Sequence, residues 1–312
     1  MARGDGGCKT DRRDASNFSF SDLRTESRQS PQRVKKWGGD MSISSVRNRE
    51  IDYAPCRYNG SRVWYRGPAQ VLQSPYVVCL GGSETYGRYV LDPYPSLLAT
   101  ALGKSAPNLG VENAGLDVFL NDPGTLLTIS RAKVAVIQLS GSHNTSNRYY
   151  SVHPRRNDRF LKASGALTAL YPEVDFTEVH FTRHLLEKLS NTCEDRFAQV
   201  AREAQQAWLA RMKKLLSQIT GKTILFWFSP VEIPAGVPEL RDDNALFMDA
   251  KIIHSLKPWA TDFLKVVPAD WHAGKTEMFN LDDHPSRALH VPGPGAHDAA
   301  ATALLPVIKR ML

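Results

Sequence analysis

A short apolar run, Tyr-Val-Val-Cys-Leu, occupies residues 76–80, and Gly-Gly-Ser-Glu-Thr-Tyr-Gly follows it directly at residues 81–87. Apolar, β-favouring residues over this length, ended by two glycines, predict a buried strand. A serine straight after such a strand lies at a tight strand-to-helix turn, which would expose its hydroxyl at the edge of a sheet. Ser83 is therefore a candidate nucleophile, with a helix-capping turn serine as the alternative.

The alternation of apolar runs and helical segments continues from residue 76 to the C-terminus. Further strands are predicted over residues 108–111, 134–139, 223–228 and 263–267. Helices are predicted over residues 94–102, 180–189, from an N-cap at Thr192 to a stop at Gly221, and over 298–312. Buried strands alternating with helices predict a three-layer α/β/α sandwich with a parallel sheet. Functional residues are then expected beyond the carboxyl ends of the strands.

The chain divides into three parts by composition. Residues 1–40 are rich in Gly, Ser, Asp and Arg without a hydrophobic period, so we expect a disordered tail or a mis-assigned start upstream of Met41. Residues 41–75 are expected to form an irregular lead-in with aromatic anchors at Tyr53, Tyr58, Trp64 and Tyr65. Residues 76–312 are expected to form the α/β domain, with a long loop from Ser142 to about Thr177.

Composition excludes several classes of protein. The chain is 42% hydrophobic and 23% charged, which is typical of a globular protein. The net charge is +7, and nine Lys and Arg against six Asp and Glu in residues 1–40 account for +3 of it, so we do not expect a nucleic-acid partner. No apolar run reaches 18 residues and no leader is evident, so we expect a cytoplasmic protein without a membrane span. The four cysteines form no zinc spacing, and neither metal nor cofactor is expected.

Two further motifs follow predicted strands. Asn108-Leu109-Gly110 and Asn113-Ala114-Gly115 come after the second strand, where a glycine can offer a backbone N–H to an oxyanion. Gly141-Ser142-His143-Asn144 follows the third strand, and the Asn144 side-chain amide could donate to the same oxyanion. Each motif alone is also compatible with ordinary turn chemistry.

The order of these motifs resembles the conserved blocks of the SGNH (GDSL-type) hydrolases. Residues 80–87 resemble the first block, the Asn-x-Gly stretch the second, and residues 141–144 the third. The resemblance implies a flavodoxin-like sheet and an acyl-ester hydrolase with Ser83 as nucleophile. The oxyanion hole would then consist of the Ser83 N–H, Gly110 or Gly115, and Asn144.

The same resemblance implies a histidine base in the loop before the last helix. Candidates are His284, His290 and His297, and we favour His297 narrowly over His290. None of the three has an aspartate three residues before it, and Gly82 stands where the first block usually has Asp. A triad would need another acid, such as Asp282 or Asp283; a Ser–His dyad is the alternative.

The chain after about residue 50 also resembles a bacterial family of uncharacterised proteins, a domain of unknown function. The stretches that carry this likeness are 55–58, 81–87, 147–150, 153–160 and 171–178. That family brings no established activity.

Arginines and aromatic residues follow Asn144 in the chain. Arg148, Arg155 and Arg156 are candidate substrate contacts, because guanidinium groups suit carboxylate, phosphate or sulfate. Aromatic residues with polar neighbours would suit a sugar. With the resemblance to SGNH hydrolases, these features lead us to expect a small-molecule or saccharide ester substrate. Two alternatives stay open: a non-catalytic ligand- or saccharide-binding protein on the same fold, and an acyltransferase in surface-polysaccharide assembly, which would share the acyl-enzyme step.

Overall fold

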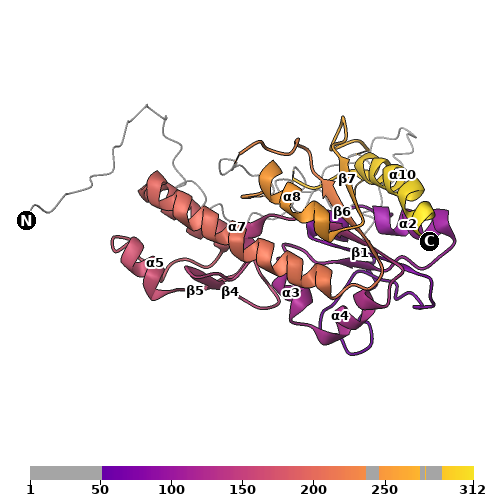
Figure 1. The fold of residues 1–312 in the computed structure, drawn as a ribbon, viewed down its shortest axis with the longest axis horizontal. Helices are drawn as coiled ribbons and strands as arrows, with labels where there is room; N and C mark the ends of the chain where they lie inside the picture. Colours follow the sequence, from indigo (N-terminus) through magenta and orange to yellow (C-terminus); the bar gives the residue numbers. More distant parts are fainter. Residues whose placement is uncertain (1–50, 237–245, 275–277, 279–289) are drawn as a thin grey trace, which may run out of the picture. The chain divides into compact units, whose positions relative to one another are not determined.

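The centre of the fold is a sheet of parallel strands in the order β2-β1-β3-β6-β7 (Figure 1). The computed structural model describes residues 51–236, 246–274, 278 and 290–312, and these fall within one unit, Arg49–Leu312. The order is that of the flavodoxin-like doubly wound folds, so the predicted fold class is confirmed. The strands are β1 (Val77–Gly81), β2 (Asn108–Gly110), β3 (Val134–Gln138), β6 (Lys222–Phe228) and β7 (Asp262–Val266).

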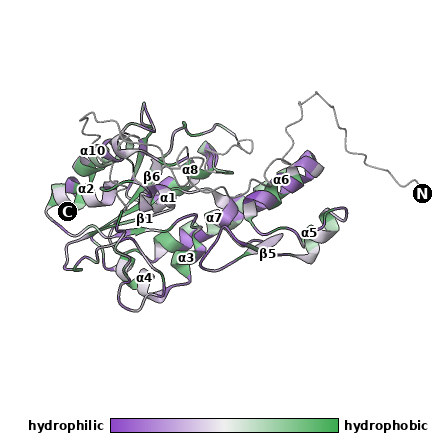
Figure 2. Cartoon of the chain, turned by 180° about the vertical axis from the view of Figure 1, so that it is seen from behind, coloured by the Kyte–Doolittle hydropathy of each residue, from purple (hydrophilic) through white to green (hydrophobic). Residues whose placement is uncertain are grey.

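Both faces of the sheet are buried, because side chains alternate between two hydrophobic clusters. Val77, Cys79 and Phe226 point to one face, and Val78 and Leu80 point to the other. A strand covered on both faces must be apolar at successive positions. This explains the apolar runs of β1, β3 and β6, and Figure 2 shows the sheet strands as predominantly hydrophobic.

Two helices, α2 (Tyr94–Leu102) and α10 (Pro294–Met311), cover one face of the sheet. α2 has the predicted bounds, and it ends at Gly103 with φ +59°, a left-handed conformation that glycine adopts without strain. α10 begins four residues earlier than predicted. Pro294 occupies its first turn, where a proline has no hydrogen bond to lose.

Helix α7 (Glu194–Ser217) covers the other face with Trp208, Met212 and Leu215. Thr192 was the expected N-cap of this helix. It is instead the last residue of the preceding helix, and its hydroxyl donates to the Lys188 carbonyl oxygen. The other elements on or near this face are α3 (Asp117–Leu120), α4 (Pro123–Ser130), α8 (Ala250–Leu256) and the 3-10 turn η2 (Lys257–Trp259).

The segment predicted as a long loop contains ordered elements, which corrects that expectation. An antiparallel hairpin, a short helix and one side of two longer helices share a hydrophobic cluster outside the main sheet (Figure 1). The aromatic residues of the segment are buried in this cluster. Their burial explains why a stretch that is otherwise polar forms ordered elements. The elements of this segment are η1 (Ser142–Asn144), β4 (Tyr150–Val152), β5 (Phe160–Ala163) and α5 (Gly165–Leu170). The helix predicted over residues 180–189 is present as α6 (Thr182–Thr192), which precedes α7.

Residues 51–75 contain one isolated bridge, between Cys56 and Tyr65. Of the four expected aromatic anchors, Tyr58 and Tyr65 are buried in the sheet cluster, Tyr53 is half-buried, and Trp64 is exposed. The expectations for residues 1–40 lie outside the described residues.

Candidate active site at the carboxyl edge of the sheet

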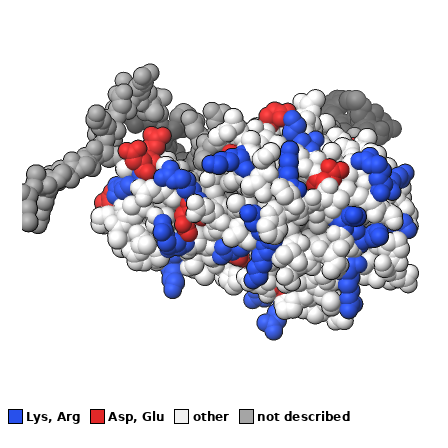
Figure 3. All heavy atoms as spheres, viewed as in Figure 1, with Lys and Arg blue, Asp and Glu red and all other residues white. Residues whose placement is uncertain are grey.

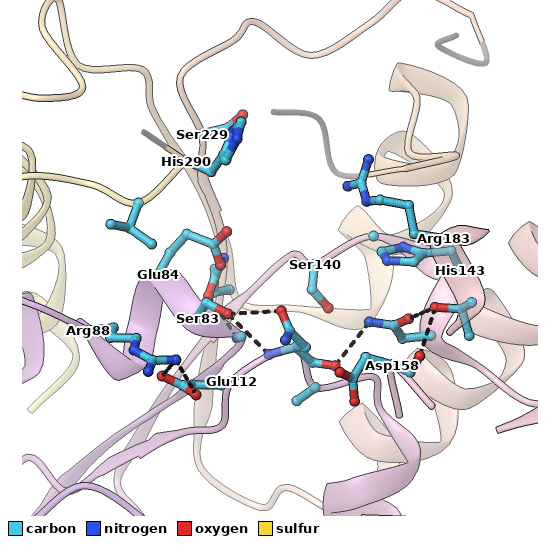
Figure 4. A pocket seen from close by; sticks show the side chains of 18 of the residues that line it. Ser83, Glu84, Arg88, Glu112, Ser140, His143, Asp158, Arg183, Ser229 and His290 are labelled. Atoms are coloured by element: carbon cyan, nitrogen blue, oxygen red, sulfur yellow. Dashed lines mark hydrogen bonds and ion pairs between the residues drawn. The ribbon is translucent and has the colours of Figure 1, made fainter. Parts of the chain in front are cut away.

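A cavity of about 880 Å³ opens at the carboxyl edge of the sheet. The parallel arrangement brings the ends of separate strands to this edge, as expected for doubly wound folds. Figure 4 shows Ser83, Glu84 and His290 on one side of the cavity, with His143 and Arg183 on the other. The lining residues that follow strand ends are Ser83, Asn113, Ser140, Asn144 and Ser229.

Ser83 is the first residue of the short helix α1 (Ser83–Tyr86), two residues after the end of β1. Its side chain is half-buried in the cavity wall. The Asn113 N–H donates to Ser83 Oγ at 3.0 Å, and Ser83 Oγ lies 3.4 Å from Asn113 Oδ1. The hydroxyl therefore has a defined direction, set by the residue that follows β2.

Gln138, the last residue of β3, holds the turn that carries Ser83. Its Oε1 accepts from the Gly82 N–H at 3.0 Å and from Thr85 Oγ1 at 2.7 Å, and its Nε2 donates to Glu84 Oε2 at 2.7 Å. Sequence reasoning missed this residue. A signal was present, because a buried polar side chain ending an apolar strand needs hydrogen-bond partners.

Asn144 lies in the cavity wall and is almost fully buried. Its Nδ2 donates to the Asn113 carbonyl oxygen at 2.9 Å, and its Oδ1 accepts from Thr182 Oγ1 at 2.6 Å. The Thr182 N–H donates in turn to the Asp158 carbonyl oxygen at 2.9 Å. Hydrogen bonds thus run from Ser83 along the cavity to Asp158 (Figure 4). Among the described residues, the Asn144 amide nitrogen makes one hydrogen bond with its two hydrogens.

Neither candidate glycine presents its N–H to the cavity. The Gly110 N–H donates to Asn108 Oδ1, and the Gly115 N–H donates to Asn157 Oδ1, each at 2.8 Å. Both glycines allow close backbone approaches instead. A Cβ on Gly110 would lie 2.3 Å from the Tyr86 nitrogen, and one on Gly115 would lie 1.9 Å from the Asn144 carbonyl oxygen.

The histidine candidates lie in different surroundings. His290 lines the cavity, whereas His297 is fully buried in the core between Tyr94 and Phe228. His297 Nδ1 accepts from the Tyr94 N–H at 3.2 Å, and burial lowers its pKa to about 3, with a smaller effect from Arg66. The structure therefore does not bring His297 to Ser83. His284, Asp282 and Asp283 lie outside the described residues.

Of the three candidate arginines, only Arg156 lines this cavity. Arg148 lies 3.8 Å from Glu203 at the surface, and Arg155 lines a separate cavity of about 230 Å³. Arg88, Arg159 and Arg183 also line the main cavity and were not among the candidates. Arg159 lies in the same segment as the candidates and Arg183 lies in the helix predicted over residues 180–189, but no local pattern showed that their side chains reach the strand ends.

Charge in the cavity is partly paired. Arg88 and Glu112 form an ion pair at 3.1 Å. Burial, with a smaller effect from Arg183, lowers the pKa of His143 to about 3, so this imidazole is neutral at neutral pH. Among the described residues, no group of three or more His, Cys, Asp or Glu side chains is placed to hold a metal ion.

A family model matches residues 41–312. The chain belongs to this family, described as a domain of unknown function (DUF6473). The expected membership in a family of uncharacterised proteins is thereby confirmed. No curated protein matches the chain.

Several solved structures are similar in fold. A family 2 carbohydrate esterase with a carbohydrate-binding domain, from Corynascus thermopiles (Myceliophthora fergusii), is 13% identical over 78% of this chain and 68% of its own, with a TM-score of 0.40. A candidate SGNH hydrolase from Slackia heliotrinireducens is 15% identical over 76% of this chain and 100% of its own, with a TM-score of 0.36. A mutant acetyl-xylooligosaccharide esterase from Geobacillus Stearmophilus is 11% identical over 76% of this chain and 95% of its own, with a TM-score of 0.37.

The surface and the helices add two observations. Lys and Arg side chains are scattered among uncharged atoms over the face drawn in Figure 3. In the parts of the chain that the structure describes, no helix combines the length and apolar composition needed to cross a bilayer.

Proposed function

We propose that the chain is a serine hydrolase of O-acyl esters, with Ser83 as nucleophile and His290 as general base. The supporting observation is that Ser83, Asn144 and His290 line one cavity at the carboxyl edge of the parallel sheet. These residues come from the turn after β1, from the segment after β3 and from the residues before α10. Side chains so far apart in sequence meet here because the strand ends converge.

In this mechanism Ser83 Oγ attacks the ester carbonyl carbon while His290 takes the hydroxyl proton. The Ser83 N–H, which has no acceptor within the helix because it is in the first turn, and the second hydrogen of Asn144 Nδ2 stabilise the oxyanion. The alcohol leaves with the proton that His290 returns. Water, deprotonated by His290, then attacks the acyl-serine; the bond between the acyl carbon and Ser83 Oγ breaks, His290 returns the proton to Oγ, and the carboxylic acid is released.

No hydrogen bond joins Ser83 to His290 among the described residues. Catalytic hydrogen bonds are often long in ligand-free sites and shorten when substrate binds. Substrate must also free the Ser83 hydroxyl from its contact with Asn113 Oδ1, so the attack geometry forms only in the complex.

A small-molecule or saccharide ester suits the cavity, because Phe181 and Trp271 line it beside hydrogen-bonding side chains. Transfer of the acyl group to a sugar instead of water would use the same acyl-enzyme. A product assay separates these two reactions, since only hydrolysis releases the free acid.

One observation favours a second candidate, a ligand-binding protein without catalysis. The Ser83 hydroxyl is already engaged by Asn113, and no described carboxylate is hydrogen-bonded to His290. A cavity of this kind could bind an ester or a saccharide and leave it unchanged.

Labelling by a fluorophosphonate distinguishes the two. The full chain should be labelled, and Ser83→Ala should abolish labelling. Ser140→Ala and Ser229→Ala are matched controls, because both serines line the same cavity. His290→Ala should slow labelling by about 10²-fold or more, whereas His297→Gln should leave it unchanged. A folded wild-type chain that is never labelled, while it binds saccharide, would favour the binding protein.

A further inference from the structure

We propose that the cavity wall formed by Arg156, Arg159 and the start of α6 is a subsite for an oxyanion group of the ester substrate. The chemical class is a carboxylate, phosphate or sulfate carried by the alcohol part of the ester. This inference rests on the proposed function, since it names the substrate class for the same site.

Arg159 is the residue that carries the inference. Its guanidinium carbon lies 4.6 Å from the centroid of the Phe181 ring, and the two residues are also joined by a backbone bridge. Its Nε is buried and has no hydrogen-bond partner in the described part of the chain. A buried guanidinium donor without an acceptor is costly. Stacking on the Phe181 ring holds the Arg159 guanidinium in the cavity wall, where a ligand can supply the acceptor.

Arg156 is brought to the same wall by a tight turn. The Arg159 N–H donates to the Arg156 carbonyl oxygen at 2.8 Å, and both side chains line the cavity. Neither arginine forms an ion pair within the described ranges. Two guanidinium groups on one turn match an oxyanion, because each presents a planar set of donors.

Within the described ranges, the acidic side chains of the cavity form no ion pair with Arg156 or Arg159. Glu112 is paired with Arg88, and Glu84 accepts from Gln138. Asp158 and Glu187 also line the cavity, but among the described residues neither forms an ion pair with Arg156 or Arg159.

The subsite is connected to the reacting serine. The hydrogen bonds from Ser83 through Asn113, Asn144 and Thr182 end at the Asp158 carbonyl oxygen, and Arg159 is the next residue. Arg183, on the same wall, lies across the cavity from Ser83 and His290 (Figure 4). One small substrate can therefore place its ester carbonyl at Ser83 and its charged group at Arg159.

Binding and turnover of matched esters test the subsite. The probes are 4-acetoxybenzoate, which carries a carboxylate on its alcohol part, and its neutral methyl ester. Calorimetric titration uses the full chain with Ser83→Ala, which prevents turnover. Inorganic phosphate is added as a competitor in a parallel titration. The variants are Arg159→Gln and Arg156→Gln, and Arg155→Gln is the matched control because it lies on the same turn but lines the other cavity.

The carboxylate probe should bind about tenfold or more tightly than the methyl ester, and phosphate should compete with it. Arg159→Gln should remove most of this preference without changing affinity for the methyl ester, Arg156→Gln should reduce it, and Arg155→Gln should not. Equal binding of the two probes, no binding of either, or a preference that survives both Arg159→Gln and Arg156→Gln would overturn the subsite.

Turnover by the wild-type chain, in which Ser83 is intact, separates this inference from the proposed function. Hydrolysis of the two esters at equal kcat/KM would overturn the subsite and leave the hydrolase standing. Preference in binding without any hydrolysis would support the subsite as an anion site and count against the hydrolase. Benzoate serves as a second competitor in the titration, and competition by phosphate weaker than by benzoate would assign the site to carboxylates.

Discussion

The backbone N–H of Asn113 donates to Ser83 Oγ at 3.0 Å, and Asn113 itself has φ +54°. The left-handed conformation after β2 turns the backbone amide toward the serine that follows β1. Asparagine tolerates this conformation better than most residues, because its short polar side chain can make local hydrogen bonds. The direction of the Ser83 hydroxyl therefore depends on the backbone of a residue 30 positions away.

Substitutions at Asn113 should distinguish the contribution of its backbone conformation from that of its side chain. Asn113→Val places a β-branched residue at positive φ, and we expect it to lower the free energy of unfolding by about 1–2 kcal/mol. It should also slow labelling of Ser83. Asn113→Gly keeps the N–H and relieves strain, so both quantities should stay near wild type. Urea denaturation and fluorophosphonate labelling measure them; equal effects of the two variants would refute this role.

Thr182 should act as a positioning residue for Asn144. Thr182→Ala removes the donor to Asn144 Oδ1, which is buried, and we expect a loss of about 1–3 kcal/mol in unfolding free energy. Labelling of Ser83 should slow as well, because Asn144 loses its fixed orientation. Thr182→Ser restores the hydroxyl and should recover the labelling rate. If serine recovers stability but not labelling, Asn144 orientation is not what Thr182 supplies.

Gly110 should be intolerant of any side chain. Its added Cβ would lie 2.3 Å from the Tyr86 nitrogen and 2.7 Å from the Thr85 carbonyl carbon, both backbone atoms of α1. We expect Gly110→Ala to lower the unfolding free energy by about 2 kcal/mol or more, because backbone must move. Gly165→Ala is the control: nothing lies within 4 Å of its Cβ, so thermal and urea midpoints should stay within error or rise slightly. Equal midpoints for the two variants would contradict the clash.

Sequence patterns predicted the sheet because both of its faces are covered. β1, β3 and β6 are apolar at nearly every position, and this signal does not depend on knowing their neighbours. The hairpin β4–β5 could not be found this way. Its strands have three and four residues; Leu161 and Lys162 are exposed, whereas Tyr150 and Phe160 are buried in the second hydrophobic cluster, outside the main sheet. Such a pair is stabilised by tertiary contacts that the local sequence does not contain.

The site was predictable at the strand ends and not at the last helix. Ser83 lies two residues after the end of β1 and Asn144 lies six residues after the end of β3, and both line the cavity. His297 was favoured over His290, yet it is followed at helical spacing by the buried Ala300, Leu304 and Ile308. That spacing, together with Pro294 as a helix start, indicates an inward-facing histidine. The Gln138 contacts needed the pairing of β1 with β3, which no local pattern gives.

Arg66 should link the irregular segment before β1 to the turn that carries Ser83. Its guanidinium donates to the carbonyl oxygens of Val90 and Leu91, each at 2.7 Å, and to that of Gly87. Lysine cannot reach these acceptors in the same geometry, so Arg66→Lys should lower the unfolding free energy by about 3 kcal/mol. Arg57→Lys, at an exposed arginine over the exposed Trp64 ring, should change it by less than about 0.5 kcal/mol. A loss for Arg66→Lys no larger than that for Arg57→Lys would show that the guanidinium hydrogen bonds of Arg66 contribute little to stability.

His297 should make the fold sensitive to acid. Burial lowers the pKa of His297 to about 3, whereas an unfolded histidine titrates near its usual value of about 6.5. Between these values the unfolded chain binds a proton that the folded chain does not, so stability is lost as pH falls below about 6.5. The slope is at most about 1.4 kcal/mol per pH unit for one histidine, and His143 adds a second of the same sign.

Replacing the buried histidine should flatten this dependence. His297→Gln can still accept from the Tyr94 N–H, but it has no proton to bind in the unfolded state. Urea denaturation at pH 7.5 and pH 5 should therefore give a smaller difference in unfolding free energy for His297→Gln than for wild type. His254→Gln, at an exposed histidine on α8, should keep the wild-type difference. An unchanged difference in His297→Gln would mean that the imidazole reaches water, and His297 would then return as a candidate base for Ser83.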